Sequence, residues 1–412
     1  MVAKMVIGRV CSTTTKKVKL IILTQYFYPE MGAPQNRLYE LAITLRELGW
    51  EVEVITAMPN YPAGKIFPGY RGKFYFREIV ENLTVHRYWL YPSKSSKALP
   101  RIFSMLSFSF TSLFSFFKMK RGTVDYLLVE SPPLTLAFTG WLLSGFSKSK
   151  LIMNVSDLWP LSAKELGAIS DGIIYRLLAK LESFLYRKST ICTGQSQEIV
   201  DYIRLRKEKN IWLLRNGVDT SRFAIGGEFI RTHRIIYAGL LGIAQGILAI
   251  IQNINFKELG LEFHIYGSGN EKEEIERYLK AHPANGVFYR DVLSREQVPG
   301  ILVQYDAALV PLVKNIYGAV PSKIYEAMAA GLPIVFSGVG EGVRIVEENN
   351  VGWRSDSGDW ESLTKNLNLL INLSDQKLFE LKHRARWVAV EKFDRKKQVT
   401  DFHEELLGLN AN

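Results

Sequence analysis

The feature of this chain that most constrains its fold is a repeated alternation of short apolar runs with amphipathic segments. Helical patterns, such as the one at 35–48 that closes at Gly49, separate the apolar runs of the first half. Strands are expected there at 19–24, 51–56, 125–129, 150–155, 190–193 and 211–214. Such alternation favours a parallel, doubly wound sheet, in which ligands bind beyond the carboxyl ends of the strands. Residues that directly follow a strand are therefore the first candidates for a functional site.

The same alternation restarts in the second half, after a stretch with no clear element at 220–232. The strands expected in this half lie at 234–237, 261–266, 287–289, 307–310 and 334–336. A chain of 412 residues is too long for one ordinary core, so two Rossmann-like α/β domains are expected. We place a loose leader at 1–18, a first domain at 19–215 and a second domain at 216–390.

The composition limits the partners and the compartment. The net charge of +11 suits an anionic partner such as a nucleotide, a phospholipid surface or nucleic acid. Nucleic acid is the least favoured of these, because the basic residues do not form a patch interleaved with aromatic residues. Two cysteines, Cys11 and Cys192, are too few for a disulfide framework and indicate a reducing compartment. No apolar stretch is long enough to span a membrane, and the leader lacks the apolar core of a signal peptide.

Motifs of metal-dependent and covalent chemistry are missing from the sequence. There is no D-x-D motif, no G-x-S-x-G motif and no Walker lysine loop. The six histidines are scattered without the spacing of metal ligands. We therefore expect chemistry that depends on electrostatics and positioning, without a metal ion or another cofactor.

The segment 102–117 carries an apolar stripe at helical spacing, with serines and a threonine on the opposite side. Phe110 and Phe114 belong to this stripe. Basic residues flank the segment on both sides, namely Arg101, Lys118, Lys120 and Arg121. Such a helix could lie in the headgroup layer of an anionic membrane. It could equally pack its stripe into the domain core, with the basic residues as a favourable helix terminus.

Glycines follow several of the expected strands. Gly32 comes after the first strand, at a helix start where the backbone can approach an anion closely. In the second half, Gly239 and Gly267 lie in strand-to-helix turns, and a third such turn spans 338–342. Three such turns in one sheet indicate a site for the phosphates of a nucleotide, although each turn alone is weak evidence.

Two further positions carry charged side chains where chemistry is expected. Asp157 directly follows the buried strand that ends at Val155, so it could contact a hydroxyl or a developing positive charge, or simply cap a turn. Lys323 and Glu326 lie three residues apart in a short helix that starts at Ser322. They could hold a phosphate and a sugar hydroxyl together, or form a plain surface ion pair.

Five blocks of the sequence, in order along the chain, resemble those of GT-B-fold glycosyltransferases of family 4, the large retaining group that uses nucleotide sugars. The resemblance covers nearly the whole chain. The blocks are 24–37, Asn216-Gly217-Val218-Asp219 with Phe223, 237–246, 265–269 and 321–335. Asp157-Leu158-Trp159-Pro160 and Pro321-Ser322-Lys323 resemble the branch that includes bacterial surface-polysaccharide transferases.

The resemblance implies roles for single residues. Glu326 matches the family's glutamate that binds the ribose hydroxyls, whereas the matching first glutamate of that block is replaced by Gly318. The usual diphosphate-binding Arg and Lys are replaced by Leu240 and Gln245. Lys323, the helix start at Ser322 and Arg215 are the candidates that remain for the diphosphate charge. The backbone N–H of Gly318 is the candidate replacement for the lost carboxylate.

The resemblance also implies the reaction and the partners. A hexose or N-acetylhexosamine would pass, with retention, from a UDP-glucose or UDP-GlcNAc type of donor to a lipid-linked or glycan acceptor. Asp157 and Lys323 would serve the chemistry of a metal-independent hexosyltransferase that works at the cytoplasmic membrane face as a peripheral protein. A helical tail at about 377–407 would cross back to the first domain, with Trp387 and Phe393 as anchors. We place the terminal helix that returns to the first domain at 391–412.

Two other functions remain open from the sequence. Nucleotide-sugar 2-epimerases share the GT-B architecture, but they need paired acid–base carboxylates and histidines, for which few candidates are present. A non-catalytic nucleotide-sugar sensor at the membrane is the second alternative. Donor turnover without an acceptor would distinguish the epimerase, and tight nucleotide binding without any turnover would indicate the sensor.

Overall fold

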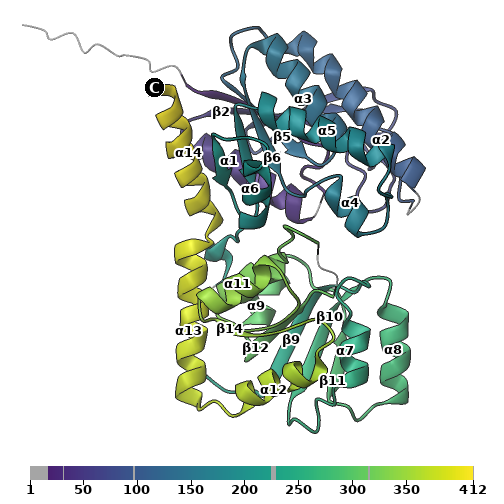
Figure 1. The fold of residues 1–412 in the computed structure, drawn as a ribbon, viewed down its shortest axis with the longest axis vertical. Coiled ribbons are helices and arrows are strands. Elements are labelled where there is room, and N and C mark those ends of the chain that lie inside the picture. The colour runs from purple at the N-terminus through teal and green to yellow at the C-terminus, as the bar shows by residue number, and fades with distance from the viewer. Residues whose placement is uncertain (1–16, 31, 96–97, 224–228, 314–315, 412) are drawn as a thin grey trace, which may run out of the picture.

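The protein consists of two α/β domains stacked along its long axis, with the C-terminal helices running along one side of both (Figure 1). The structure, a computed structural model, describes residues 17–411 except 31, 96–97, 224–228 and 314–315. The expected leader at 1–18 therefore lies almost wholly outside the described residues. The two-domain, doubly wound α/β fold predicted from the sequence is confirmed.

The N-terminal domain is built on an eight-stranded sheet in the order β3-β4-β2-β1-β5-β6-β7-β8. Its strands are β1 (Lys19–Leu23), β2 (Glu51–Ala57), β3 (Tyr75–Val80), β4 (Leu83–Tyr88), β5 (Tyr126–Ser131), β6 (Lys150–Val155), β7 (Ile191–Gly194) and β8 (Ile211–Leu213). Only β3 runs antiparallel, in a hairpin with β4 whose turn residues Glu81 and Asn82 have positive φ. This hairpin is missing from the sequence prediction, because β3 is a half-exposed edge strand without a continuous apolar run.

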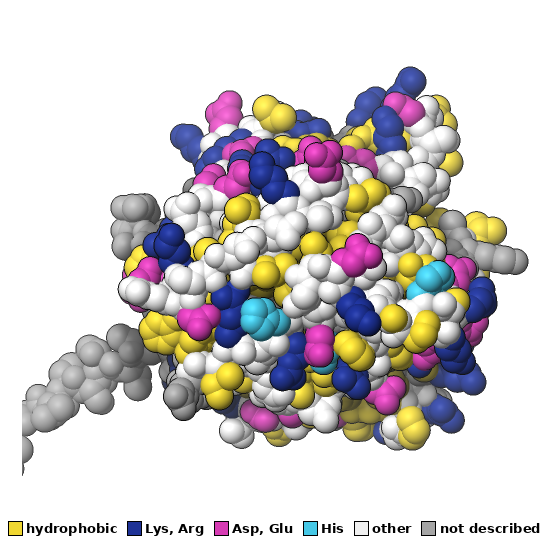
Figure 2. All heavy atoms as spheres, turned by 90° about the horizontal axis from the view of Figure 1, so that it is seen from below, with side chains coloured by type: hydrophobic (Ala, Val, Ile, Leu, Met, Phe, Trp, Pro, Cys, Tyr) yellow, Lys and Arg dark blue, Asp and Glu magenta, His cyan; other side chains and the backbone are white. Residues whose placement is uncertain are grey.

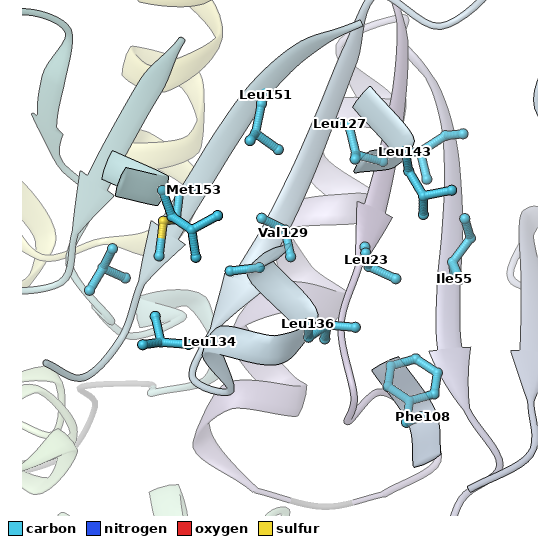
Figure 3. Close-up of a cluster of buried hydrophobic side chains, with 14 of the residues drawn as sticks. Leu23, Ile55, Phe108, Leu127, Val129, Leu134, Leu136, Leu143, Leu151 and Met153 are labelled. Atoms are coloured by element: carbon cyan, nitrogen blue, oxygen red, sulfur yellow. The ribbon is translucent and has the colours of Figure 1, made fainter. Parts of the chain in front are cut away.

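Helices cover both faces of this sheet. They are α1 (Ala33–Glu47), α2 (Ala98–Ser112), the 3-10 helix η1 (Leu113–Lys118), α3 (Leu134–Ser147), α4 (Leu161–Glu165), α5 (Ile173–Lys188) and α6 (Gln197–Arg204). Alternate residues of each strand face opposite layers. Leu20 and Ile22 pack with α1 and the terminal helix, whereas Leu23 packs with α2 and α3, where Phe108 and Leu136 close the core (Figure 3).

The C-terminal domain contains a six-stranded parallel sheet in the order β11-β10-β9-β12-β13-β14. The strands are β9 (Arg234–Leu240), β10 (Glu262–Ser268), β11 (Val287–Arg290), β12 (Ala307–Pro311), β13 (Ile334–Ser337) and β14 (Gly352–Ser355). The helices are η2 (Thr220–Arg222), α7 (Ile247–Asn253), α8 (Lys272–Ala281), α9 (Gln297–Leu302), α10 (Ser322–Ala329), α11 (Glu341–Glu348) and α12 (Trp360–Ile371). The edge strand β14 is also missing from the sequence prediction, because it is short and only partly buried.

The last two helices connect the domains. Helix α13 (Asp375–Lys392) packs on α10, and α14 (Arg395–Ala411) packs on α1 of the N-terminal domain (Figure 1). Phe393, between them, is buried, and its ring lies 5.1 Å from that of Tyr325. The expectation that Trp387 anchors this tail is wrong, because this residue is 59% exposed.

Helix α2 and the following η1 turn most of their hydroxyl side chains inward and one apolar stripe outward, while Phe108 of α2 is buried in the core. Thr111 Oγ1 donates a hydrogen bond to the Trp89 carbonyl at 2.6 Å, and Ser109 Oγ donates to the Met105 carbonyl at 2.8 Å. Small residues allow close packing on α3, and the local hydrogen bonds satisfy their hydroxyls. The exposed apolar side chains, here called the aromatic face, are Ile102, Phe103, Leu106, Phe110, Phe114 and Phe117. The reading in which this stripe forms domain core is therefore wrong.

A buried carboxyl group on α5 should make the stability of this domain depend on pH. Glu182 accepts hydrogen bonds from Tyr186 at 2.8 Å and Tyr202 at 3.1 Å, and burial raises its pKa from 4.5 to about 7. A raised folded-state pKa contributes stability below the unfolded pKa, and this stability is lost as the pH rises through about 7. We expect Glu182→Gln to remove about 2 kcal/mol of this pH dependence.

Urea denaturation at about pH 5 and about pH 8 measures this effect. Relative to the parent chain, Glu182→Gln should gain stability at the higher pH, whereas the exposed Glu208→Gln should not. Parallel pH profiles for the parent chain and Glu182→Gln would contradict the assignment.

Candidate active site

A cavity of about 230 Å³ opens at the carboxyl ends of β9 and β12, beside the start of α10. Its walls come from the end of β9, the following turn, and the segment that leads into α10. The lining residues are Tyr237, Leu240, Gln245, Val310, Pro311, Leu312, Ala319, Val320, Pro321, Ser322 and Lys323. This is the position at which an open α/β sheet binds ligands.

Lys323 is the only cationic side chain among these lining residues. Its Nζ donates to Glu326 Oε2 at 2.9 Å, so the two charges meet on the first turn of α10. Both side chains are partly exposed, which leaves them free to exchange this ion pair for contacts to a ligand. The structure thus places Ser322, Lys323 and Glu326 together, as the sequence predicted, at a helix N-terminus that favours anions.

Gly239 leaves room for this lysine. A Cβ at position 239 would lie 3.1 Å from Lys323 Cε and 2.9 Å from the Tyr237 hydroxyl, which donates to the Leu240 carbonyl. Leu240 and Gln245 both line the cavity. Gln245 Oε1 is buried without a hydrogen-bond partner.

Position 267 requires glycine because another strand approaches it closely, which the sequence did not reveal. It pairs with Gly239 in the β9–β10 ladder, and a Cβ there would lie 1.8 Å from the Gly239 carbonyl oxygen. The neighbouring Glu271 carboxylate accepts backbone N–H bonds from Ile247 and Leu248, and burial raises its pKa. The start of α7 therefore already faces a carboxylate, whereas Ser322 and Lys323 at the start of α10 line the cavity.

Arg215 and Gly318 lie at the domain interface rather than in this cavity. Arg215 Nη1 donates to Glu341 Oε1, beside a separate cavity of about 310 Å³ next to α11. The N–H of Gly318 donates to Glu198 Oε2 of the N-terminal domain at 2.8 Å. Both groups that the sequence offered to the donor are thus engaged by carboxylates from the opposite domain.

On the N-terminal side, the two predicted residues lie at carboxyl ends of strands. Gly32 precedes α1, and a Cβ there would lie 2.3 Å from Gln35 Oε1. Asp157 Oδ2 accepts a hydrogen bond from Ser162 Oγ of α4 at 3.0 Å, and burial raises its pKa. Asp157 therefore caps the local turn that leads into α4.

A buried polar chain runs along the same edge and was not singled out from the sequence. Glu130 accepts bonds from Arg37 and Asn154, both at 2.5 Å, and Thr193 Oγ1 donates to Asn154 Oδ1 at 2.6 Å. Arg37 also donates to Asn216 Oδ1 at 2.7 Å, which links α1 to the interdomain segment. The sequence did carry a signal, because Glu130 and Asn154 are polar residues at the ends of apolar strands, the criterion that selected Asp157.

Across the residues that the structure describes, no group of three or more His, Cys, Asp or Glu side chains could hold a metal ion. Within the same part of the chain, no helix has the length and apolarity needed to cross a bilayer.

The fold is that of solved GT-B glycosyltransferases. Sucrose-phosphate synthase from Thermosynechococcus elongatus has a TM-score of 0.71 at 12% identity, covering 96% of this chain and 100% of that chain. HepE from Anabaena, solved with UDP and glucose, has a TM-score of 0.67 at 14% identity, covering 95% and 100%. At these identities the likeness shows the fold of the chain.

Family models match both domains. Residues 32–216 match the glycosyl transferase 4-like domain, and residues 232–372 match glycosyl transferases group 1. The chain therefore belongs to the GT-B-fold glycosyltransferases of family 4.

Two bacterial proteins that are similar to this chain are named as glycosyltransferases. WcaI of Escherichia coli (strain K12), named as a colanic acid biosynthesis glycosyl transferase, is 24% identical over 336 residues, 76% of this chain and 82% of that protein. WbjE of Pseudomonas aeruginosa, named as a glycosyltransferase, is 26% identical over 321 residues, 72% of this chain and 79% of that protein.

Proposed function

We propose that this protein transfers a hexose or N-acetylhexosamine, with retention of configuration, from a UDP-sugar to a lipid-linked or polysaccharide-precursor acceptor. The observation that carries the proposal is the pairing of Lys323 with Glu326 at the α10 start, on the wall of the cavity. The UDP bound to HepE and the name of WcaI support the choice of donor base and acceptor class.

In this proposal, Lys323 and the first N–H groups of α10 hold the diphosphate, because a cation and a helix N-terminus both stabilise negative charge. Glu326 lies one turn further along and accepts hydrogen bonds from the ribose hydroxyls. Uncharged Leu240 and Gln245 leave Lys323 as the cationic side chain of the cavity wall. Lys323 must then release Glu326 when the donor binds.

The proposed reaction breaks the bond between the anomeric carbon and the diphosphate oxygen. Lys323 and the α10 N–H groups stabilise the charge that develops on the leaving group. The acceptor hydroxyl attacks from the same face, and the leaving phosphate oxygen takes its proton, which gives retention without a nucleophilic carboxylate. Asp157, across the cleft, contacts the acceptor or the developing positive charge on the sugar. No metal ion takes part in this scheme.

The proposal places the enzyme on an anionic membrane surface, with the aromatic face in the headgroup layer. Basic side chains next to this face are exposed, namely Arg101, Lys118, Lys120 and Arg121. The apolar surface continues onto α3, where Phe146 contacts Phe116 with ring centroids 5.4 Å apart, and Phe138 and Leu142 are also exposed. By contrast, apolar side chains are scattered among charges on the far end of the C-terminal domain (Figure 2).

A donor panel in thermal-shift format tests the proposed function. UDP and one UDP-hexose or UDP-N-acetylhexosamine should raise the melting temperature, because a ligand that binds only the folded state stabilises it. GDP-linked and ADP-linked sugars should give smaller shifts. Stabilisation by another nucleotide alone would contradict the UDP assignment, and an epimerised sugar formed without acceptor would contradict transfer.

A further inference from the structure

We infer that Glu198 is a positioning residue, which ties the donor-binding segment of the C-terminal domain to the acceptor side of the cleft. This inference rests on the proposed function, because it assigns the two sides of the cleft to donor and acceptor. It concerns a group that lies outside the donor cavity, on α6 of the N-terminal domain.

The contacts of Glu198 run from one domain to the other. Its Oε2 accepts the Gly318 N–H at 2.8 Å, and its Oε1 accepts a bond from Arg344 Nη2 of α11 at 3.3 Å. The Glu198 side chain is 12% exposed and that of Arg344 is 44% exposed, so the bond to Gly318 is the better shielded of the two. Charge-assisted hydrogen bonds of this kind are stronger than neutral ones.

The C-terminal domain also places a carboxylate against α6. Glu341, at the start of α11, accepts the backbone N–H of Glu198 at 3.1 Å and pairs with Arg215 through its other oxygen. Its side chain is buried. Two glutamates thus cross the interface in opposite directions, and together with Arg215 and Arg344 they form a cluster, here called the clasp.

The backbone of Gly318 is shaped for this contact. Its φ of +87° is a conformation that favours glycine, and a Cβ there would lie 2.7 Å from Ile199 Cγ1 of α6. Any side chain at 318 would push the segment away from α6. The glycine therefore allows the N–H to reach Glu198.

The clasp fixes one end of the segment that lines the proposed donor cavity. Five residues directly after Gly318, ending at Lys323, line the cavity that holds the proposed diphosphate site. Fixing Gly318 against α6 therefore fixes the start of α10 relative to the acceptor domain. Small displacements between reacting groups cost large factors in rate, so Glu198 should affect turnover more than donor affinity.

Three full-length variants are assayed on the donor and acceptor that the parent chain uses. Glu198→Ala should lower kcat by at least about tenfold while the UDP Kd stays within about twofold. Glu198→Gln keeps an oxygen that can accept the Gly318 N–H, so it should recover most of the lost kcat. Asp201→Ala, one turn along α6 and without a contact to the C-terminal domain among its hydrogen bonds, should behave like the parent chain.

Small-angle scattering without ligand gives a readout that does not need turnover. Glu198→Ala should increase the radius of gyration, because the domains lose part of the clasp, and Asp201→Ala should not. If the parent chain transfers no sugar, the proposed function fails, yet the scattering result still reports on the clasp.

Three outcomes would overturn the inference. They are an unchanged kcat and radius of gyration in Glu198→Ala, an equal loss of UDP affinity and kcat, or no recovery in Glu198→Gln. If Glu198→Ala does not fold, Arg344→Ala takes its place, with an expected fall in kcat of about threefold at unchanged UDP Kd. An unchanged kcat in Arg344→Ala would then count against the clasp.

Discussion

Replacing Lys323 or Glu326 by alanine is expected to weaken UDP binding about tenfold to a hundredfold, or about 1–3 kcal/mol. Lys323 is the only cationic side chain among the residues that line the cavity, and Glu326 is its partner at 2.9 Å. Removing the lysine takes a charge-assisted contact from the diphosphate. Removing the glutamate takes the hydroxyl acceptor from the ribose.

Isothermal titration with UDP measures both losses. Lys397→Ala is a matched control, because Lys397 also forms an ion pair at 2.9 Å, with Glu391 on α13. This control should bind UDP like the parent chain. UDP affinity that is unchanged in both Lys323→Ala and Glu326→Ala would show that the nucleotide binds elsewhere.

The double variant Phe103→Ser/Phe110→Ser is expected to lower partitioning onto anionic vesicles by at least about tenfold. Both rings are more than 60% exposed, so their loss should cost little folding stability. Burial of one aromatic side chain contributes about 1.5–3 kcal/mol when it is complete, and insertion into a headgroup layer recovers part of this. Co-sedimentation with vesicles of phosphatidylcholine and phosphatidylglycerol measures the partitioning.

Leu205→Ser is the matched control, because Leu205 is an exposed apolar residue just beyond α6, outside the aromatic face. It should leave vesicle binding unchanged. UDP binding should be the same in all these variants. Equal partitioning of the double variant and the parent chain would contradict the membrane assignment, whereas salt-insensitive binding would contradict the part given to Lys118, Lys120 and Arg121.

Features of this protein that depend on neighbours close in the sequence could be predicted, whereas those that depend on distant segments could not. Lys323 and Glu326 could be paired from the sequence, because three residues along a helix set their proximity locally. Arg215 and Gly318 could not be placed in this way, because their partners Glu341 and Glu198 belong to the other domain. The close approach of the Gly239 carbonyl to Gly267 could not be predicted either, since that backbone belongs to another strand.

In helix α2, one feature could be predicted from the sequence and another could not. The sequence predicted an apolar stripe opposite a hydroxyl stripe, and both exist, but periodicity cannot say which stripe a neighbour covers. Only the packing on α3 decided that the hydroxyl side is buried and the aromatic face is exposed. The sequence by itself determined the two Rossmann-like domains and the charged pair at the start of α10, through local periodicity and spacing. The tertiary structure decided the domain clasp and the orientation of α2, because these depend on contacts between segments far apart in the chain.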